Sequence, residues 1–535
     1  MLALMDKVPI IAIDFGTSYS SLAFFNNGNL EMIEILGNVQ LPMYIAFTET
    51  EVLFGDAAKR EAIKSPNNTI VDIKYLIGRN FDDIIIKKGM RFWPFIMKNI
   101  DDKLMIEVEF KGKKKQFFPE EILSLFITKM KECAESHLGR KIKGFVITVP
   151  ASFNNAQRQA IKDAGSLAGI NLLRFINEPT AAAITYVLNN KIQESKNVLI
   201  LNFGADTLDV TIFAISKNYI EAISTVGRNV GGKDIDQIIA SNLIKTMEVN
   251  GNAFEKTNIN CVNLLNTSKE AKECLTSSST AFINFESINE LDNYIVFKSS
   301  MSRQTFEELN KDLFNSFLVI VEKAIYDAKI DKANIEDVVL VGGSAHIPKF
   351  RSILQSYFNG NILNSSIDSN VAAVTGAAVY AAILNGEQEN VPKPLKNMHL
   401  FDITPISVGI QTFGYLNNIV IQKNSTIPVE ETFDLKLNFP SEPIKLIVFE
   451  GENPIAHNNN ILGKYEMNVI KSARSANIME IEFSFKIDAD GIFHLLARES
   501  DLGVIFESKA GNMNICPICD GIVFNAKYCK IHKMN

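Results

Sequence analysis

One unusual pattern occurs twice in the sequence, and this repetition constrains the fold more than any other feature. Residues 13–22 read IDFGTSYSSL and residues 201–210 read LNFGADTLDV. Each copy has an apolar run, an acid or amide, Phe-Gly, a hydroxyl-bearing turn and further apolar residues. A glycine turn after a strand lets backbone N–H groups approach phosphate oxygens without an intervening Cβ. The repeat therefore predicts two lobes that clamp a triphosphate from both sides.

The first turn carries the side chains that a nucleotide phosphate requires. Gly16 permits close backbone approach, and Thr17, Ser18 and Tyr19 add donors. Asp14 at the strand end can hold the waters of a Mg²⁺ ion, which keeps much of its hydration shell. One such turn alone is also found in ordinary loops, so the duplicate is what favours phosphate binding. A third glycine turn, VGGSAHIPKF at 341–350, suits the sugar or α-phosphate end of a nucleotide.

The order of apolar patterns predicts two kinds of domain. Between residues 8 and 386, strand-like runs such as GFVITVP alternate with helical stretches such as QRQAIKDAGSLAG, which is typical of α/β layers. Residues 387–401 are expected to be a linker. Residues 402–507 contain short alternating runs separated by turn sequences, which predict an antiparallel β-sandwich. Residues 508–535 form a short tail that holds half of the cysteines.

Composition excludes several classes of partner. The net charge is −7, which argues against a general nucleic-acid or anionic-membrane binder because phosphate neutralisation needs a basic face. The sequence contains no apolar run of about 18 residues, so no transmembrane helix is predicted. The N-terminal residues read directly into a strand and do not resemble a signal peptide. We therefore expect a cytoplasmic protein whose cysteines are thiols or metal ligands.

The tail has the spacing of a metal site. Cys516 and Cys519 form a CxxC pair, and Cys529 and His532 form a CxxH pair. Four such ligands predict a closed tetrahedral Zn²⁺ site with a structural role. Reduced, unstructured cysteines or a disulfide are the alternatives.

Several longer motifs occur together and in order. They are IDFGTSYS, VDIKYLIGR, VITVPASFNNAQRQAIKDAG, RFINEPTAAAITY, VGGKDID and DVVLVGGSAHIPKF. Together they closely resemble the heat shock protein 70 chaperones, within the wider actin-like ATPase fold. The resemblance continues through LFDITPISVGIQT and FKIDADGIFHLLA and covers most of the chain. It implies an α/β actin-like ATPase domain of two duplicated lobes followed by a β-sandwich that binds peptides. The zinc-knuckle tail lies outside it.

The resemblance also implies roles for individual residues. Lys74 would orient the attacking water and the γ-phosphate, Glu178 and Asp14 would hold the water shell of Mg²⁺, and Thr207 would lie near the γ-phosphate. The remaining contacts to ATP or ADP would come from Gly16, Thr17, Ser18, Tyr19, Asn202, Gly204, Gly231, Gly232, Lys272, Gly342, Gly343 and Ser344. Pro150, Arg158 and Asp402 would relay the nucleotide state to the second domain. Without the resemblance, Lys74 reads as a solvated surface lysine and Pro150 as a plain turn residue.

The second turn departs from the family pattern. The family has an aspartate followed by glycines, whereas this chain has Asn202, Gly204, Ala205 and Asp206. Asn202 lacks the negative charge of the family's aspartate. Ala205 would destabilise the turn by about 1–2 kcal/mol if its position needs φ > 0. Asp206 at ~4 Å from a phosphate would be repelled by roughly 4 kcal/mol. Asp206 therefore either turns away or reaches the magnesium and replaces the charge lost at Asn202.

The base end of the site departs as well. Glu273 and His346 stand where the family stacks the adenine between two arginines, and Asn370 replaces an aspartate. Each lost cation–π contact is worth ~0.5–2 kcal/mol. We therefore expect weaker ATP affinity than is usual for the family, and hydrolysis that is slow or impaired.

In the β module, the resemblance implies a channel for an extended apolar peptide. Its lining would come from Thr412, Phe413, Leu435, Leu437 and Ile444. Apolar residues in such alternating runs can equally be core residues of a sandwich. The family continues with a long helical lid, which residues 508–535 do not resemble, so we expect rapid peptide exchange. His399 interrupts the aliphatic run expected in the linker, which would weaken coupling between the domains.

These observations predict an ATP-dependent chaperone of the stress response that binds extended apolar segments of unfolded proteins. J-domain co-chaperones and nucleotide-exchange factors are the further partners that the resemblance implies. A nucleotide-binding regulatory or adaptor module without useful turnover is the alternative. A sugar kinase of the same fold clan is a weaker reading, because the β module and its linker count against it.

Overall fold

The computed structural model describes most of the chain. The described residues are 8–26, 28–101, 103–251, 254–288, 294–360, 363–387, 391–438, 444–467, 478–499, 503–509, 514–515 and 522–523. For residues at the edges of some strands, including Leu437, only the backbone is described. The predicted zinc ligands Cys516, Cys519, Cys529 and His532 lie outside the described residues.

The first lobe is built on a mixed sheet with strand order β12-β11-β1-β2-β3, to which β4 adds by pairing with β2. The strands are β1 (Ile10–Phe15), β2 (Tyr19–Asn26), β3 (Asn29–Ile33), β4 (Leu41–Pro42), β11 (Gly144–Val149) and β12 (Leu172–Asn177). β1 pairs parallel with β11 and antiparallel with β2. β1 and β11 are nearly continuous apolar runs, as expected for strands covered on both faces.

The second lobe repeats this arrangement. Its sheet has the order β18-β13-β14-β15-β19-β22. The strands are β13 (Lys196–Phe203), β14 (Leu208–Ile215), β15 (Tyr219–Arg228), β18 (Asp337–Val341), β19 (His399–Ile403) and β22 (Thr426–Ile427). β13 pairs parallel with β18 and antiparallel with β14, just as β1 pairs with β11 and β2. The two sequence repeats therefore occupy equivalent hairpins in two similar sheets.

Two helices pack against each other between the lobes. α6 (Glu178–Asn189) and α12 (Ala372–Leu384) are rich in alanine, and their side chains join a core with residues of both sheets. A Cβ on Gly376 would lie 1.8 Å from the carbonyl oxygen of Ala181, so the two helix backbones are in direct contact. This shared core joins the two sheets that carry the phosphate turns.

Other elements cover each lobe and form its outer part. On the first lobe these are α1 (Gly55–Lys64), α2 (Ile73–Leu76), α3 (Ile84–Gly89), α4 (Pro119–Leu138), α5 (Asn155–Leu167) and the sheets of β5 (Tyr44–Phe47), β6 (Val52–Phe54), β7 (Thr69–Val71), β8 (Ile96–Ile100), β9 (Lys103–Phe110) and β10 (Lys113–Phe117). On the second they are α7 (Gly232–Val249), α8 (Asn258–Ser277), α9 (Arg303–Leu309), α10 (Lys311–Ala328), α11 (Pro348–Tyr357) and the hairpin β16 (Thr280–Ile288) and β17 (Tyr294–Ser302). Each lobe has its own apolar core.

The β module consists of two four-stranded antiparallel sheets. Their orders are β21-β20-β24-β25 and β23-β26-β27-β28. The strands are β20 (Val408–Gln411), β21 (Asn417–Ile421), β23 (Val429–Asn438), β24 (Ile444–Glu450), β25 (Asn460–Met467), β26 (Ile478–Ile487), β27 (Phe493–Glu499) and β28 (Gly503–Lys509). Val408 and Val448 of one sheet share a core with Phe483 and Leu495 of the other, which makes the module a sandwich. β29 (Asn514–Ile515) and β30 (Ile522–Val523) form a separate short pair.

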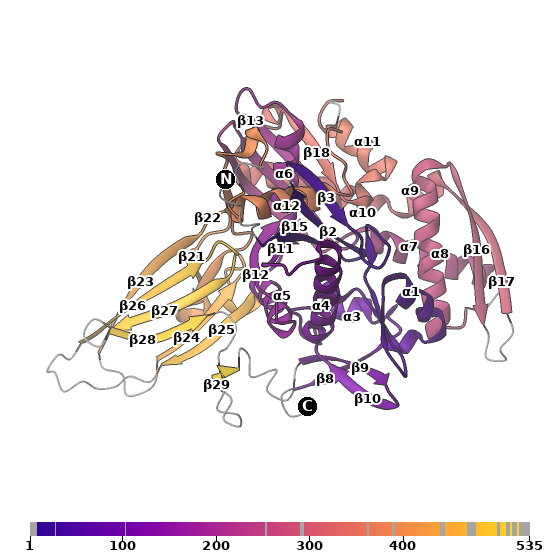
Figure 1. The fold of residues 1–535 in the computed structure, drawn as a ribbon, viewed down its shortest axis with the longest axis horizontal. Helices are drawn as coiled ribbons and strands as arrows, with labels where there is room; N and C mark the ends of the chain where they lie inside the picture. Colours follow the sequence, from indigo (N-terminus) through magenta and orange to yellow (C-terminus); the bar gives the residue numbers. More distant parts are fainter. Residues whose placement is uncertain are drawn as a thin grey trace.

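The sandwich lies against the two-lobed domain. Figure 1 shows it on one side of the molecule, with the β16–β17 hairpin at the opposite end. β19, which includes the end of the predicted linker, pairs parallel with β15 and so extends the sheet of the second lobe. The His399 amide donates to the Asn218 carbonyl at 2.8 Å, so the histidine does not prevent this pairing. The link between the domains is thus part of a sheet.

Candidate nucleotide site

The two repeated turns line one cleft, of about 360 Å³, between the lobes. The first turn joins β1 to β2, and the second joins β13 to β14. A Cβ on Gly16 would lie 2.2 Å from the Tyr19 carbonyl oxygen, so this turn requires glycine. Gly204 donates its amide to the Thr207 carbonyl at 2.9 Å, which closes the second turn. Of the predicted phosphate contacts in these turns, Gly16, Thr17, Ser18, Tyr19, Asn202, Gly204 and Thr207 all line the cleft.

A buried ion pair lies at the floor of the cleft. Lys74, on the short helix α2, donates to Glu178 Oε1 at 2.7 Å and to the Phe15 carbonyl at 2.6 Å. Glu178 is the first residue of α6, where a carboxylate suits the helix N-terminus. Burial acts to lower the pKa of Lys74, but the charges of Glu178 and Asp206 raise it overall. Lys74 is 3% exposed and is therefore a charged group of the cleft floor rather than a surface lysine.

Asp14 lies beside this pair at the end of β1. Its Oδ1 accepts from the Thr148 hydroxyl at 2.7 Å, and the same hydroxyl accepts from the Phe15 amide at 3.1 Å. Burial, with a contribution from the charge of Glu178, raises the pKa of Asp14 to about 6. The partly buried Asp14 and the buried Glu178 thus face the same space, where a hydrated cation would relieve their repulsion.

The altered second turn has its own hydrogen-bonding arrangement. Asn202 donates its side-chain amide to Glu178 Oε2 at 2.5 Å. Glu178 therefore has one oxygen bonded to a lysine and the other to an amide. A carboxylate at position 202 could not donate in this way and would repel Glu178, so the asparagine suits the contact.

Ala205 and Asp206 fit the turn without backbone strain. Neither has a positive φ, so the cost considered for Ala205 does not arise. Asp206 is 6% exposed and lines the cleft, so it does not turn away from the phosphate space. Burial raises the pKa of Asp206, while the charge of Lys74, the Thr17 hydroxyl and the charge of Lys233 counteract this shift. Asp206 is thus a third carboxylate that faces the same space as Asp14 and Glu178.

The third glycine turn supports the second turn. Ser344 donates its hydroxyl to the Gly204 carbonyl at 2.8 Å, and the Gly232 amide donates to the same carbonyl at 3.1 Å. Lys272 donates to the Gly232 carbonyl at 2.9 Å and pairs with Asp236 at 2.7 Å. A Cβ on Gly342 would lie 2.4 Å from the Phe203 carbonyl, and one on Gly231 would lie 2.3 Å from the backbone of Ala205. Gly343, in contrast, borders open space, which leaves room for a ligand.

The base end of the cleft is polar. Glu273 is 61% exposed at its side chain and pairs loosely with Lys269 at 3.8 Å. His346 Nε2 and the Ser369 hydroxyl are 2.8 Å apart. Gln40 of the first lobe donates to the Asn370 carbonyl of the second at 3.5 Å. The residues that replace the two arginines thus form contacts within the protein, and neither offers a cationic plane.

Arg158 and Asp402 lie where the sandwich meets the lobes. Buried Arg158 donates to the Phe153 carbonyl at 3.1 Å, to Asn177 Oδ1 at 2.8 Å and to the Asp490 carbonyl of the sandwich at 3.2 Å. Asp402 accepts from the Thr180 hydroxyl of α6 at 2.8 Å. Pro150 follows β11 and accepts from the Phe153 amide at 3.1 Å. These predicted relay residues therefore contact the elements between the cleft and the sandwich.

The predicted peptide-channel residues divide into two groups. Thr412 and Phe413 lie in the exposed connection between β20 and β21, and Phe413 is fully exposed. Leu435 and Ile444 are partly buried and pack against the sandwich core. The structure describes only the backbone of Leu437, which pairs with Met479. The Phe413 side chain contributes nothing to the sandwich core and is open to solvent.

Sequence reasoning missed several residues of the site. Lys269 and Asp236 line the cleft, and Asp209 lies behind the second turn, where burial raises its pKa to about 7. Lys233 pairs with Asp72 across the two lobes. Lys269 lies on α8 one turn before Lys272 and Glu273, and this helical spacing is the signal that could have identified it.

Among the described residues, no group of three His, Cys, Asp or Glu side chains has the geometry of a direct metal site. Across the same part of the chain, no helix is both long and apolar enough to cross a membrane.

The fold and the site define a two-lobed protein with a nucleotide-type cleft and an attached β-sandwich. The family described as Hsp70 protein matches residues 10–513. Heat shock 70 kDa protein 2 of Paracoccidioides lutzii is 42% identical over 92% of this chain and 75% of its own length. Heat shock 70 kDa protein of Emericella nidulans is 41% identical over 92% of this chain and 76% of its own length. Heat shock cognate 70 kDa protein 3 of Dictyostelium discoideum is 40% identical over 91% of this chain and 78% of its own length.

The chain therefore belongs to the Hsp70 family, and the family prediction is confirmed. The members of this family are ATP-dependent chaperones, and these relatives support the same function for the chain over the adaptor alternative.

Proposed function

We propose that this chain binds Mg·ATP in the cleft between its lobes and hydrolyses it slowly to control how the sandwich holds extended apolar peptides. The observation that carries the proposal is the convergence on one cleft of two equivalent glycine turns and the Lys74–Glu178 pair. A pair at this place can orient a phosphate and a water molecule between the two turns. The attachment of the sandwich through β19 supports coupling, because this strand belongs to the sheet that carries the second turn.

The residues of the cleft fit a hydrated magnesium ion with a triphosphate. Asp14, Glu178 and Asp206 supply carboxylate oxygens, which suit Mg²⁺ and its bound water. When bound, the ion would offset the negative charge of the phosphates. Lys74 is held charged on the floor of the cleft and would face the same phosphates. Space beside Gly343 leaves room for the sugar end.

Within this proposal, Asp206 takes over the charge that the family carries at position 202. Asn202 is bonded to Glu178, whereas Asp206 is buried and faces the cleft, so the acid has moved by four residues within one turn. Such a relocation preserves the total charge around the metal. It also explains how the chain tolerates an acid near the phosphates.

Calorimetry of ADP with and without Mg²⁺ tests this relocation. We expect Asp206→Asn to weaken Mg²⁺-dependent ADP affinity by about tenfold, which corresponds to ~1.4 kcal/mol. The double variant Asn202→Asp/Asp206→Asn should restore the Mg²⁺-dependent ADP affinity. The control is Asp312→Asn, which changes an exposed acid and should have no effect. Tighter Mg·ADP binding by Asp206→Asn would show that the carboxylate repels the nucleotide, and would rule out the relocation.

Single-turnover hydrolysis of labelled ATP tests the enzymatic part of the proposal. We expect the natural chain to hydrolyse ATP slowly in the presence of Mg²⁺. If the missing charge at position 202 limits the chemistry, Asn202→Asp should hydrolyse ATP faster. Turnover by Asn202→Asp alone, with none by the natural chain, would contradict ATP hydrolysis and favour the adaptor reading.

Peptide exchange tests the chaperone part. A fluorescent heptapeptide rich in leucine should dissociate faster with Mg·ATP than with Mg·ADP, and a serine-substituted peptide should not bind. Identical dissociation rates in both nucleotides would contradict coupling.

We further propose J-domain co-chaperones and nucleotide-exchange factors as partners, a structural Zn²⁺ at the tail cysteines and a cytoplasmic location. Metal analysis can test the zinc site, and cell fractionation can test the location.

A further inference from the structure

A second cavity, of about 130 Å³, adjoins the nucleotide cleft and has no role in the proposed function. We call it the side chamber and define it by Tyr44, Asp72, Trp93, Lys233, Leu265 and Lys269. It lies beyond the first phosphate turn, so Thr17, Ser18 and Tyr19 line both spaces. Lys269 donates to the Tyr19 hydroxyl at 3.2 Å and lies 5.0 Å from the centre of its ring. This contact stands at the boundary between the chamber and the cleft.

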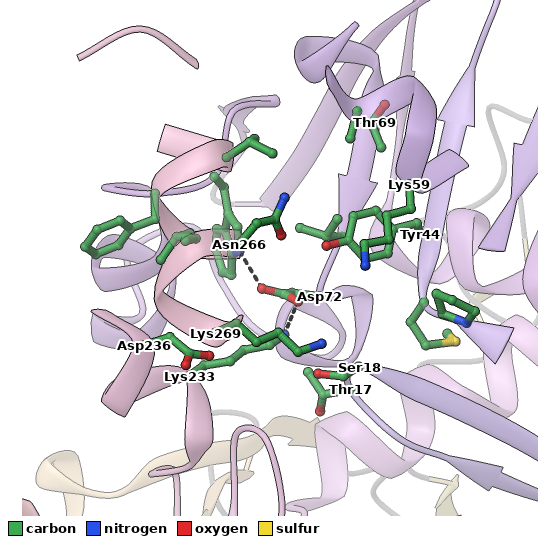
Figure 2. Close-up of a pocket in the computed structure, with 18 of the residues that line it drawn as sticks. Thr17, Ser18, Tyr44, Lys59, Thr69, Asp72, Lys233, Asp236, Asn266 and Lys269 are labelled. Carbon is green, nitrogen blue, oxygen red and sulfur yellow. Dashed lines mark hydrogen bonds and ion pairs between the residues drawn. The ribbon is translucent and has the colours of Figure 1, made fainter. Parts of the chain in front are cut away.

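Both lobes contribute walls to the side chamber. Figure 2 shows Tyr44 and Lys59 of the first lobe on one side and Asn266 of α8 in the second lobe on the other, with Asp72 between them. Asp72 accepts from the Trp93 indole at 2.9 Å and pairs with Lys233 of α7. An occupant of the chamber would therefore contact both lobes at once.

The size and lining of the chamber suit a single aromatic ring. An engineered protein cavity of about 150 Å³ is known to hold benzene. Met43, Val71, Trp93, Val262 and Leu265 supply apolar surface around the space. Trp93 is fixed in place because it stacks on Phe95 at 5.8 Å and donates to Asp72. The chamber is thus a preformed apolar space with a few polar groups at its edge, as is typical of small-molecule sites.

The charges at the edge favour an anion. Both acids of the chamber are already neutralised, since Asp72 pairs with Lys233 and Asp236 pairs with Lys272 at 2.7 Å. Lys269 has a weaker partner, because Glu273 is 3.8 Å away and 61% exposed. Lys59 adds a further positive charge at the wall. The chamber therefore has an excess of positive charge next to its apolar floor.

We propose that the side chamber binds a small planar aromatic carboxylate, with its ring against Trp93 and Leu265 and its carboxylate toward Lys269. The binding of the carboxylate goes beyond the proposed function and does not depend on it, whereas its coupling to the nucleotide rests on the proposed function. Since the occupant would contact both lobes, it would stabilise the arrangement of the lobes seen in this structure. By thermodynamic reciprocity, the carboxylate would then tighten nucleotide binding by the same factor by which the nucleotide tightens carboxylate binding.

Fluorine NMR of the full-length chain tests this proposal with 4-fluorobenzoate as the probe. We expect saturable binding to the nucleotide-free protein, and binding at least as tight in the presence of Mg·ADP. The cationic analogue 4-fluorobenzylamine should bind at least tenfold more weakly. Absence of binding, equal binding of the two probes, or displacement of 4-fluorobenzoate by Mg·ADP would each overturn the proposal. Nucleotide binding is measured separately by calorimetry, so failure of one site is distinguished from failure of the other.

Variants locate the bound probe. Val262→Phe should fill the chamber and abolish binding, while Val249→Phe, the same change at a position 86% exposed, should leave it unchanged. Lys269→Gln should weaken binding at least fivefold and Lys269→Arg should retain it. The lysine variants decide the question even if Val262→Phe fails to fold. Unchanged binding in Lys269→Gln would place the probe elsewhere and overturn the assignment.

Discussion

At the scale of single residues, the cleft is a balance of buried charges. Lys74 lies among Asp14, Glu178 and Asp206, and these carboxylates keep it charged although burial opposes this. Burial in turn raises the pKa of Asp14 to about 6. Removing one charged side chain of this set leaves the opposite charges buried without a partner.

We predict that Lys74→Ala lowers the free energy of unfolding by on the order of 3 kcal/mol, because Glu178 becomes a buried charge without its cation. Chemical denaturation monitored by circular dichroism would measure the loss. Lys87→Ala is the matched control, since Lys87 pairs with Asp82 at 3.0 Å on the surface and such pairs contribute under about 1 kcal/mol. Equal losses in the two variants would contradict a special role for burial.

Much of this residue-scale arrangement could be anticipated from the sequence. The duplicated turn identified the cleft residues of the two turns, because strand, glycine and hydroxyl follow each other directly in the chain. Lys74 and Glu178, which also line the cleft, were expected only from the family resemblance. The direction of Asp206 could not be anticipated. It depends on Lys74 and Lys233, which come from different parts of the chain and meet Asp206 only in the folded protein.

At the scale of elements, the contact of α6 with α12 joins the two lobes through a shared core. Both helices contain several alanines, and the closest point is Gly376 against the Ala181 backbone. Small side chains allow the helices to approach until their backbones touch. Alanine composition predicts a buried helix, but it does not identify the partner.

We predict that Gly376→Ala destabilises the two-lobed domain by about 1–3 kcal/mol, because the added Cβ would lie 1.8 Å from a carbonyl oxygen. Thermal unfolding of the nucleotide-free chain would report this as a lower midpoint. Gly343→Ala serves as the control, since a Cβ there meets nothing within 4 Å and its φ is not positive. An unchanged midpoint in Gly376→Ala would mean that the helices separate at little cost.

At the scale of the whole molecule, the sandwich docks on the lobes through buried polar contacts. Asp490 pairs with Lys162 at 3.0 Å and accepts from the Phe175 amide at 3.0 Å. Glu450 accepts from the Asn155 amide at 3.3 Å beside Arg158. Burial raises the pKa of Glu450 from its usual 4.5 to about 7.

We predict that docking strengthens as the pH falls from above 7 toward 4.5. In this window the docked state holds a proton on Glu450 that an exposed carboxylate has released, so the docked state is favoured at low pH and loses this advantage as the pH rises through 7. The effect is at most about 3 kcal/mol. Burial also raises the pKa of Asp402, which acts in the same direction.

Energy transfer between one dye on the sandwich and another on the first lobe would measure this pH dependence. Glu450→Gln should reduce the pH dependence of docking and leave only the contribution of Asp402. Glu431→Gln is the control, because Glu431 is an exposed acid of the same sandwich and does not contribute to the shifted pKa of Glu450. A pH profile that is identical in Glu450→Gln and the natural chain would assign the dependence to other groups.

The sequence by itself determined the two-lobed cleft, its glycine turns and the β-sandwich, because these depend on patterns that are local in the chain or repeated in order. Only the tertiary structure decided that Asp206 faces the cleft, that β19 joins the sheet of the second lobe, and that a side chamber lies between Trp93 and α8. Each of these depends on contacts between residues far apart in the sequence. The physical reason is that burial and electrostatic interaction depend on spatial neighbours, whereas turn and strand geometry depend mainly on adjacent residues.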